Sequence, residues 1–412
     1  MAKTILLYGA TGYSGRLIAN EARRLQDANA IGVRMVLAAR NRQALADLAH
    51  ERGMEARAFA LNDRDQIVRQ LQGIDVVLNA AGPFSATASR LATAALEARC
   101  HYVDINGEMD VYRRLDDYAS YADDRNVCMV CSAGFTAAAS SLLLEEALVK
   151  LATRDPPIKQ LGAIRFAMSA LDGFSRGGAS TMWRSLREQV TVVRSTTGSA
   201  NDPALWHSPV AKLERSVDFT PPEKSRASSR DGPTTPLRDR HRRIAMAANL
   251  VDTLTARLTA SHRDVSVRDI ESYIEVNSAE RLAYPIATLG TPFLTTRLVR
   301  KVAGLAINML PDGPTQQERS RDRQTLLLSI EDPLQRRVID WCISTPNTYD
   351  FSARVALAIA QRVASVGHSE HGWKTPGQIL HAAKCSLLRL HKDGPLRECE
   401  FVDRLKMEGQ RA

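Results

Sequence analysis

Several features that mark other protein classes are scarce or absent in this chain of 412 residues. Aromatic residues make up 5% of it, and no basic run is interleaved with aromatics, which argues against a stacking groove for nucleic acid. No paired set of metal ligands and no Tyr-x-x-x-Lys pair occurs. The sequence therefore predicts no metal site and no proton donor of the short-chain reductase kind.

Cysteine is also scarce, with six residues dispersed along the chain. Cys128 and Cys131 form a C-x-x-C inside a predicted strand, where the odd spacing points the two side chains to opposite faces. We interpret them as core cysteines rather than as a redox or zinc pair. Dispersed thiols, and a first strand that begins at once with no signal peptide, lead us to expect a cytoplasmic protein.

We expect no transmembrane helix, because charged residues, glycine and proline interrupt the most apolar run. The most apolar long stretch, 284–310, contains glycine, proline and three cations, so it is either a core helix or an amphipathic segment that binds a lipid-like substrate or a membrane surface. The net charge of +9 fits an anionic cofactor and an anionic substrate or membrane. Hydrophobic and charged fractions of 44% and 25% are ordinary for a globular protein long enough for two domains.

The most informative segment lies near the N-terminus, where an apolar run at 5–8 leads into a glycine-rich turn and then into helical apolar spacing. Glycines three residues apart let a backbone turn sharply, approach a pyrophosphate and pack a helix against a strand. The helix N-terminus offers free N–H groups to the phosphate charge. We predict a dinucleotide site here, with a mere tight turn as the alternative, and its residues are Gly9, Ala10, Thr11, Gly12, Tyr13, Ser14 and Gly15.

The end of the second predicted strand, 34–39, indicates which dinucleotide binds. An NAD site normally has Asp or Glu there to accept from the ribose 2′-hydroxyl, whereas this chain has Arg40 and Asn41. A guanidinium suits a 2′-phosphate because it forms charge-assisted, bidentate hydrogen bonds. We predict NADP(H) as the cofactor; the alternative for Arg40 is a solvated loop arginine.

The loop after the fourth predicted strand, 75–79, is a second candidate contact with the cofactor. Small residues there let the backbone approach a ligand, and a proline stiffens the exit. An ordinary strand-to-helix turn is the alternative. The residues assigned to this contact are Asn79, Ala80, Ala81, Gly82, Pro83 and Phe84.

Alternating strands and helices over 1–150 predict an α/β fold with an N-terminal Rossmann domain. Its predicted strands are 5–8, 34–39, 56–61, 75–79, 101–105 and 127–131. Longer strands such as 161–168, separated by polar stretches, predict a second, α+β substrate domain over 151–350, with a mobile excursion at 194–243. Residues 351–412 are expected to form C-terminal helices, among them 350–366 and 376–390, that pack back on the Rossmann domain.

Several motifs together resemble one family. YGATGYSG, NAAGPF, YVDINGE, SAGF and WKTPGQIL, in this order, resemble the saccharopine dehydrogenase-like oxidoreductases, and the closer likeness is to the trans-acting enoyl reductases that partner polyketide synthases. Segments 174–186 and 313–330 add to the resemblance. It implies an NADP-binding domain, a substrate domain and a C-terminal helix that returns to the first domain. Thr136 follows Phe135 where the family commonly has an aspartate, so substrate or activity differs if that carboxylate orients substrate in relatives.

Hydride transfer needs a dry pocket and a group that supplies a proton or binds a developing oxyanion. The catalytic candidates at the end of the fifth strand are Tyr102, Asp104 and Glu108. Glu108 could instead cap the following helix. Candidates for binding a substrate carboxylate or a phosphopantetheine phosphate, or alternatively for a turn with helix caps, are Arg176, Gly177, Gly178 and Ser180.

These observations lead to one expected function and two alternatives. We expect an NADPH-dependent enzyme that reduces a carbon–carbon double bond of a lipid or polyketide-type intermediate, free or carrier-bound. Expected partners are a polyketide synthase, a membrane surface that the protein meets peripherally, or a second copy in a homodimer, and not nucleic acid. The alternatives are a carbon–nitrogen dehydrogenase of the saccharopine type and a non-catalytic nucleotide-binding protein at a membrane surface.

Overall fold

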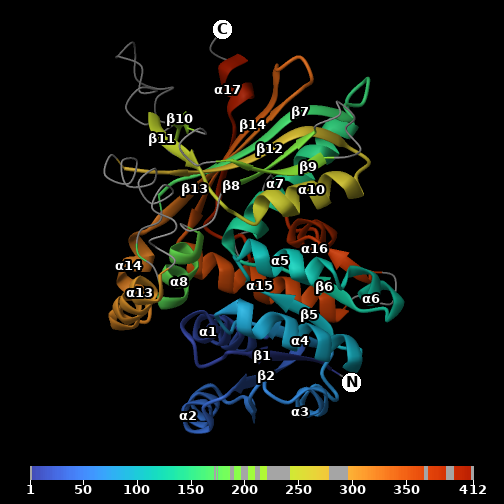
Figure 1. The fold of residues 1–412 in the computed structure, drawn as a ribbon. Coiled ribbons are helices and arrows are strands. Elements are labelled where there is room, and N and C mark those ends of the chain that lie inside the picture. The colour runs from blue at the N-terminus through green and yellow to red at the C-terminus, as the bar shows by residue number, and fades with distance from the viewer. Residues whose placement is uncertain are drawn as a thin grey trace. The chain divides into compact units, whose positions relative to one another are not determined.

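The computed structural model describes residues 2–170, 173, 175–185, 190–195, 203–208, 214–219, 242–277, 296–365, 370–386 and 394–409. The chain divides into two compact units, Met1–Ala138 with Thr348–Cys385 and Ala139–Asn347 with Ser386–Ala412. Each unit has its own β-sheet (Figure 1). Helix α7, Phe135–Ala152, contains the boundary between them, so the first unit ends earlier than the predicted boundary at 150.

The first unit contains a seven-stranded parallel sheet in the order β15-β6-β5-β4-β1-β2-β3. The six predicted strands are confirmed, and their central members are apolar because helices cover the sheet. The seventh, β15, was not predicted; it pairs in parallel with β6 and belongs to the returning C-terminal segment. The strands are β1 Lys3–Tyr8, β2 Val33–Ala39, β3 Glu55–Ala58, β4 Val76–Asn79, β5 His101–Asp104, β6 Cys128–Val130 and β15 Gly372–Lys374.

Helices cover this sheet on both faces. Strand order runs outward from β1 and from β4 in opposite directions, so right-handed crossovers place α1 and α2 on one face and α4 on the other. Helix α15 packs beside α1 and across β1, β4 and β5 (Figure 1). The helices are α1 Tyr13–Asp27, α2 Arg42–Arg52, α3 Arg64–Gln70, α4 Phe84–Ala98, α5 Met109–Asp116, α6 Ala119–Asp124, α15 Thr348–Ser365 and α16 Pro376–Ala382.

Local signals explain where several of these helices begin and end. Thr375 and Gln378 form the predicted capping box at the start of α16. The helix ends at Ala382 rather than at 390, because Lys384 takes a left-handed φ of 59°. Residues 387–390 of the predicted helix lie outside the described ranges.

The C-x-x-C cysteines, Cys128 and Cys131, are buried and free, as predicted for core residues.

The second unit contains a nine-stranded mixed sheet in the order β10-β11-β12-β7-β13-β14-β16; off this path, β8 pairs with β12 and β9 pairs with β8. Strands β7 and β12 are parallel, and the other pairs are antiparallel. The strands are β7 Gln160–Met168, β8 Val190–Ser195, β9 Pro203–Ser208, β10 Glu214–Asp218, β11 Arg242–Ala247, β12 Ser266–Glu275, β13 Arg323–Glu331, β14 Arg337–Pro346 and β16 Glu400–Asp403.

Two expectations for this part of the chain need correction. The predicted excursion 194–243 contains strands β9 and β10, which pair with β8 and β11; its segments 196–202, 209–213 and 220–241 lie outside the described residues. The stretch after Cys385 belongs to the second unit rather than packing on the first, because β16 pairs with β14. Neither correction could be drawn from local periodicity.

The helices of the second unit are α7, α8 Arg176–Ser185, α10 Asp252–His262, α13 Arg297–Met309, α14 Gln316–Arg321 and α17 Arg404–Gly409. Lys150 of α7 forms an ion pair of 2.9 Å with Asp403 of β16. Asp252, at the start of α10, has no exposed surface, and burial raises the pKa of its carboxyl group to about 7. Among the described helices, none is long and apolar enough to cross a membrane.

Candidate functional site

The glycine-rich turn after β1 is packed so closely that two of its positions require glycine. Gly9 has a φ of 88°, and a Cβ there would lie 2.7 Å from the backbone nitrogen of Ala81. A Cβ at Gly15 would overlap the carbonyl oxygen of Gly9. The turn after β1, the start of α1 and the turn after β4 therefore meet with backbone against backbone. The sequence predicted the close packing at the glycines but not the approach of the turn after β4.

The N-terminus of α1 is open to an anion. Gly12 at its N-cap supplies no capping side chain, and the first turn holds no acidic residue. The N-cap residue therefore binds none of the first N–H groups of this 15-residue helix with a side chain, and the helix dipole adds positive potential there. Arg16 braces the turn by donating from Nε to the carbonyl of Thr11 at 3.0 Å. This geometry fits a pyrophosphate.

Arg40 and Asn41, which follow β2, have different roles. Arg40 is exposed, and its guanidinium makes no hydrogen bond to another described residue. Its charge opposes the rise that burial causes in the pKa of Tyr8, so it lies near the carboxyl end of β1. Asn41 caps α2 by accepting from the backbone nitrogen of Ala44 at 3.1 Å. The charged guanidinium of Arg40 therefore suits a phosphate, whereas the side-chain oxygen of Asn41 is used in capping α2.

The remaining predicted cofactor contacts lie on the same two turns and at the starts of α1 and α4. Ala80 is buried, and Asn79 fixes the turn after β4 by accepting from the backbone nitrogen of Ala81 at 3.0 Å. Thr87 adds a second tie by donating to the carbonyl of Ala81 at 2.6 Å. The residues that were predicted to contact the cofactor and that lie on these turns and helix starts are Ala10, Thr11, Tyr13, Ser14, Ala80, Gly82, Pro83 and Phe84.

Tyr102 and Asp104, predicted to be catalytic, lie in a buried network at the carboxyl ends of β4 and β5. The Tyr102 hydroxyl donates to Asp104 Oδ2 at 2.9 Å, and Asn79 Nδ2 donates to that hydroxyl at 3.3 Å. All three side chains have no exposed surface. Burial raises the pKa of Asp104 to about 6, and backbone N–H groups that bind its carboxylate oppose the rise.

Glu108 belongs to the same network through two consecutive Asx turns. Asp104 Oδ1 accepts from the backbone nitrogen of Asn106 at 2.9 Å, and Asn106 Oδ1 accepts from that of Glu108 at 2.8 Å. The Glu108 carboxylate then accepts from the backbone nitrogen of Phe84 at 3.1 Å, at the start of α4. It occupies the N-cap position of α5 but caps α4 instead. The D-x-N-x-E spacing is the sequence signal for these turns.

The predicted substrate-binding residues lie at the start of α8 in the second unit. Arg176 forms an ion pair of 3.2 Å with Asp312 and donates to the carbonyl of Leu310 at 2.6 Å. The Ser175 hydroxyl accepts from the backbone nitrogen of Gly178 at 3.0 Å. Gly177 and Ser180 continue the helix. These contacts are those of a capped helix start, which was the alternative interpretation.

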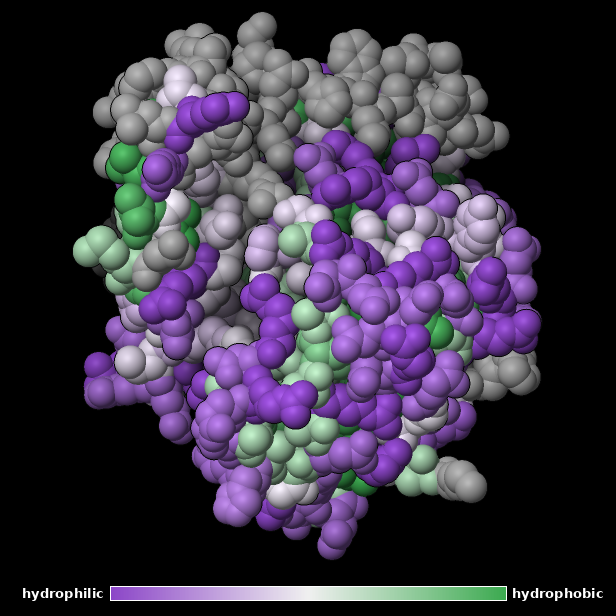
Figure 2. Space-filling view, turned by 60° about the horizontal axis from the view of Figure 1, so that its bottom comes forward, coloured by the Kyte–Doolittle hydropathy of each residue, from purple (hydrophilic) through white to green (hydrophobic). Residues whose placement is uncertain are grey.

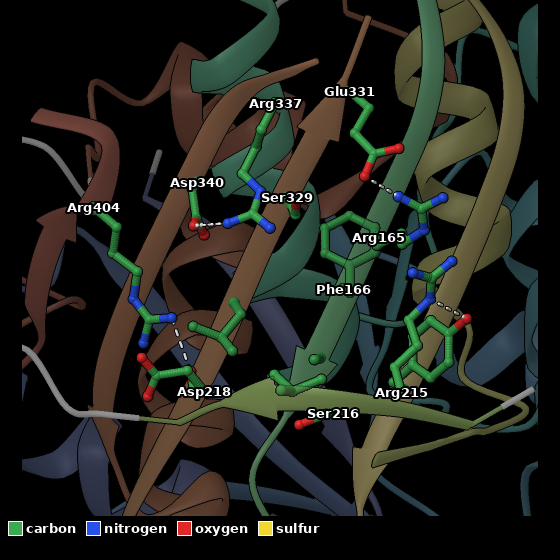
Figure 3. A pocket seen from close by; sticks show the side chains of 14 residues that line it. Arg165, Phe166, Arg215, Ser216, Asp218, Ser329, Glu331, Arg337, Asp340 and Arg404 are labelled. Atoms are coloured by element: carbon green, nitrogen blue, oxygen red, sulfur yellow. Dashed lines mark hydrogen bonds and ion pairs between the residues drawn. The ribbon is translucent and has the colours of Figure 1, made fainter. Parts of the chain in front are cut away.

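A cavity of about 360 Å³ in the second unit was not anticipated, because its lining comes from strands far apart in the sequence. Figure 3 shows four arginines around it, Arg165, Arg215, Arg337 and Arg404. Arg165 binds Glu271 at 3.0 Å and Glu331 at 2.6 Å, Arg337 binds Asp340 at 2.7 Å, and Arg215 binds Glu271 at 3.4 Å. Arg404 donates to the backbone carbonyl of Asp218 at 2.8 Å. The cavity wall is therefore largely charge-balanced by its own ion pairs.

Comparison with known proteins agrees with the geometry of the first unit. Residues 5–133 match the sequence profile of the saccharopine dehydrogenase NADP binding domain. No curated protein matches the chain. Two solved structures share its fold at low identity. Apo saccharopine dehydrogenase (L-Glu forming) from Saccharomyces cerevisiae is 12% identical, with 97% of this chain and 100% of that chain covered and a TM-score of 0.54. Homospermidine synthase from Legionella pneumophila in complex with NAD is 9% identical, with 98% of this chain and 92% of that chain covered and a TM-score of 0.57.

Proposed function

We propose, on the premise that residues 5–133 are an NADP-binding domain of the saccharopine dehydrogenase type, that this oxidoreductase reduces a carbon–carbon double bond of a lipid-like or acyl substrate. The observation that carries the proposal is the glycine-rich N-terminus of α1, which no N-cap side chain closes and near which Arg40 makes no hydrogen bond to another described residue. The apolar stretch 284–310 supports a lipid-like substrate. When bound, NADPH supplies the hydride for such a reduction.

Each part of the first unit has a task in holding this cofactor. The backbone N–H groups of the turn Gly9–Gly15 suit the pyrophosphate, and the Arg40 guanidinium suits the 2′-phosphate. The backbone of Ala80 and Ala81 lies against Gly9 and closes the cradle from the side of β4. The fit depends on bare backbone, so the close packing at the two glycines is what shapes the cradle.

We infer a positioning role for Tyr102, Asp104 and Glu108. Their exposed fractions are 0%, 0% and 6%, and their polar atoms bind other protein groups. Together they tie the turn after β5 to the start of α4, which holds the turn after β4 in place. Preorganisation of this kind keeps reacting groups aligned and costs little at the moment of reaction.

The two solved structures favour a second candidate, a carbon–nitrogen dehydrogenase. One is named saccharopine dehydrogenase and the other homospermidine synthase. The charge-balanced cavity in Figure 3 suits a ligand that carries both charges, as amino acids do. The charged groups of such a substrate would form ion pairs with Arg165 and Arg337 in place of the pairs that these arginines form within the protein.

One experiment separates the candidates. Purified protein is first titrated with NADPH, and NADPH oxidation is then followed with a 2-enoyl thioester and, separately, with a 2-oxo acid plus an amine. Turnover of the thioester supports double-bond reduction, whereas turnover of only the acid and amine replaces it with the second candidate. If NADPH does not bind, both proposals fail.

A further inference from the structure

Helix α13 of the second unit exposes a stripe of large apolar side chains. Val302, Leu305 and Met309 have exposed fractions of 58%, 62% and 86%. Their spacing of three and four residues places them on one face of the helix. Among the described residues, six large hydrophobic side chains are exposed, and these three and the adjacent Leu310 account for four of them. Such a concentration on one element marks an interaction surface.

The stripe is not a core face that lacks its partner, because α13 already packs on its other side. Val299, Ala303 and Ile307 lie about a third of a turn around the helix from the stripe and are partly buried, and α13 contacts α8. The hydrogen bond from Arg176 to the carbonyl of Leu310 and the ion pair from Arg176 to Asp312 fix the end of α13 to the start of α8. Helix α13 is thus attached to α8 on one side, and its apolar stripe is exposed on another.

The charge on α13 identifies the kind of surface that fits it. The helix carries Arg297, Arg300 and Lys301 and no acidic residue. Arg297 and Lys301 are exposed, and helical geometry places them along one side of the stripe. Figure 2 shows the resulting apolar patch at the left margin of the molecule, over α13. An apolar face flanked by cations is the pattern of helices that lie in a membrane interface and meet anionic headgroups.

We propose that α13 docks on the surface of an anionic lipid bilayer. The stripe of Val302, Leu305 and Met309 enters the boundary between headgroups and acyl chains, and Arg297 and Lys301 meet the lipid phosphates. Thirteen residues of helix extend about 20 Å, so α13 lies along the surface and does not cross it. Three apolar side chains and a few cations give reversible binding that weakens as salt rises.

Vesicle flotation of the full chain tests this proposal. Vesicles of phosphatidylcholine alone are compared with vesicles of phosphatidylcholine and phosphatidylglycerol, without NADPH or substrate. We expect binding to the anionic vesicles that is about tenfold weaker for Leu305→Ser, since the variant loses the transfer of one leucine side chain into the acyl boundary. Leu334→Ser is the matched control, because Leu334 is 72% exposed in the same unit and lies outside α13.

A second pair of variants tests the electrostatic contribution to vesicle binding. Lys301→Glu should weaken binding to anionic vesicles severalfold and leave the weak binding to neutral vesicles unchanged. Lys159→Glu, which reverses the charge of another exposed lysine of this unit, should have no effect. Circular dichroism confirms that each variant is folded; all four positions are exposed, so each variant is expected to fold.

Three outcomes would overturn the proposal: equal binding of the unchanged protein to both vesicle types, equal effects of Leu305→Ser and Leu334→Ser, or a dimer that Leu305→Ser dissociates while vesicles are not bound. The last would assign the stripe to a second copy of the chain. Because the assay contains no cofactor or substrate, its failure leaves the proposed reductase function standing, and a failure of NADPH to bind leaves the membrane proposal standing.

Discussion

Replacing Arg40 with alanine should remove the preference of the first unit for NADPH over NADH. Arg40 follows β2, is exposed, and makes no hydrogen bond to another described residue. Its truncation therefore breaks no internal bond that would change stability. The expected loss is confined to whatever the guanidinium contacts outside the protein, which we assign to the 2′-phosphate.

The size of the effect follows from the chemistry of that contact. A hydrogen bond that involves a charged group contributes about 1.5–3 kcal/mol. Losing it corresponds to a roughly 10- to 150-fold rise in the Kd for NADPH. NADH lacks the phosphate, so its Kd should change less than about twofold. The first unit should unfold at the same denaturant concentration as before.

Isothermal titration calorimetry with each coenzyme measures both constants at one fixed ionic strength, because salt screens exposed charges. Arg42→Ala is the control, since Arg42 is an exposed arginine in the first turn of α2. Equal losses for NADPH and NADH, or an equal effect of the two variants, would show that Arg40 does not read the phosphate.

Three further predictions concern packing within each unit: two for the first unit and one for the second. Gly15→Ala should push α1 away from the carbonyl of Gly9, cost about 1–3 kcal/mol of stability and sharply weaken NADPH binding; an unchanged Tm would contradict the close packing. Glu108→Ala should lower the free energy of unfolding by about 1–3 kcal/mol, because a backbone N–H of α4 loses its acceptor, whereas Glu108→Gln should retain most of it in urea denaturation. The buried Asp252 has a pKa raised from 3.8 to about 7, so its contribution to stability is present below pH 4 and is lost as the pH rises to about 7. Relative to Asp252→Asn, the unchanged protein should lose up to about 4 kcal/mol over that range, and parallel urea midpoints from pH 4 to 8 would refute this.

Local signals in the sequence were sufficient for most of the first unit. Six strands were predicted because each is an apolar run bounded by turn or cap residues. In the structure, Asn41 and Gly53 occupy the two caps of α2. Strand β15 is only three residues long and has no periodicity of its own. It is a strand because the edge of β6 pairs with it, and a pairing partner more than 200 residues away is not visible in sequence.

In the candidate site, local sequence indicates the features that depend on backbone geometry or on one exposed side chain. The glycine turn has the predicted close packing, and Arg40 is exposed at the end of β2. Asp104 and Glu108 were selected as acids at strand ends, but their burial comes from the packing of neighbouring turns, which no local pattern encodes. The ion pairs of the second unit join residues as distant as Arg165 and Glu331, so they emerge only with the sheet.

The way the first unit is assembled from two segments affects how it can be made in a cell. A ribosome that has released the chain to Ala138 still has to add about 210 residues before Thr348 appears. At 5–20 residues per second this takes roughly 10–40 s. During that interval the apolar surface of β1, β4 and β5 lacks α15, and β6 remains an open edge. We therefore expect the nascent chain to keep this hydrophobic surface uncovered until translation nears its end.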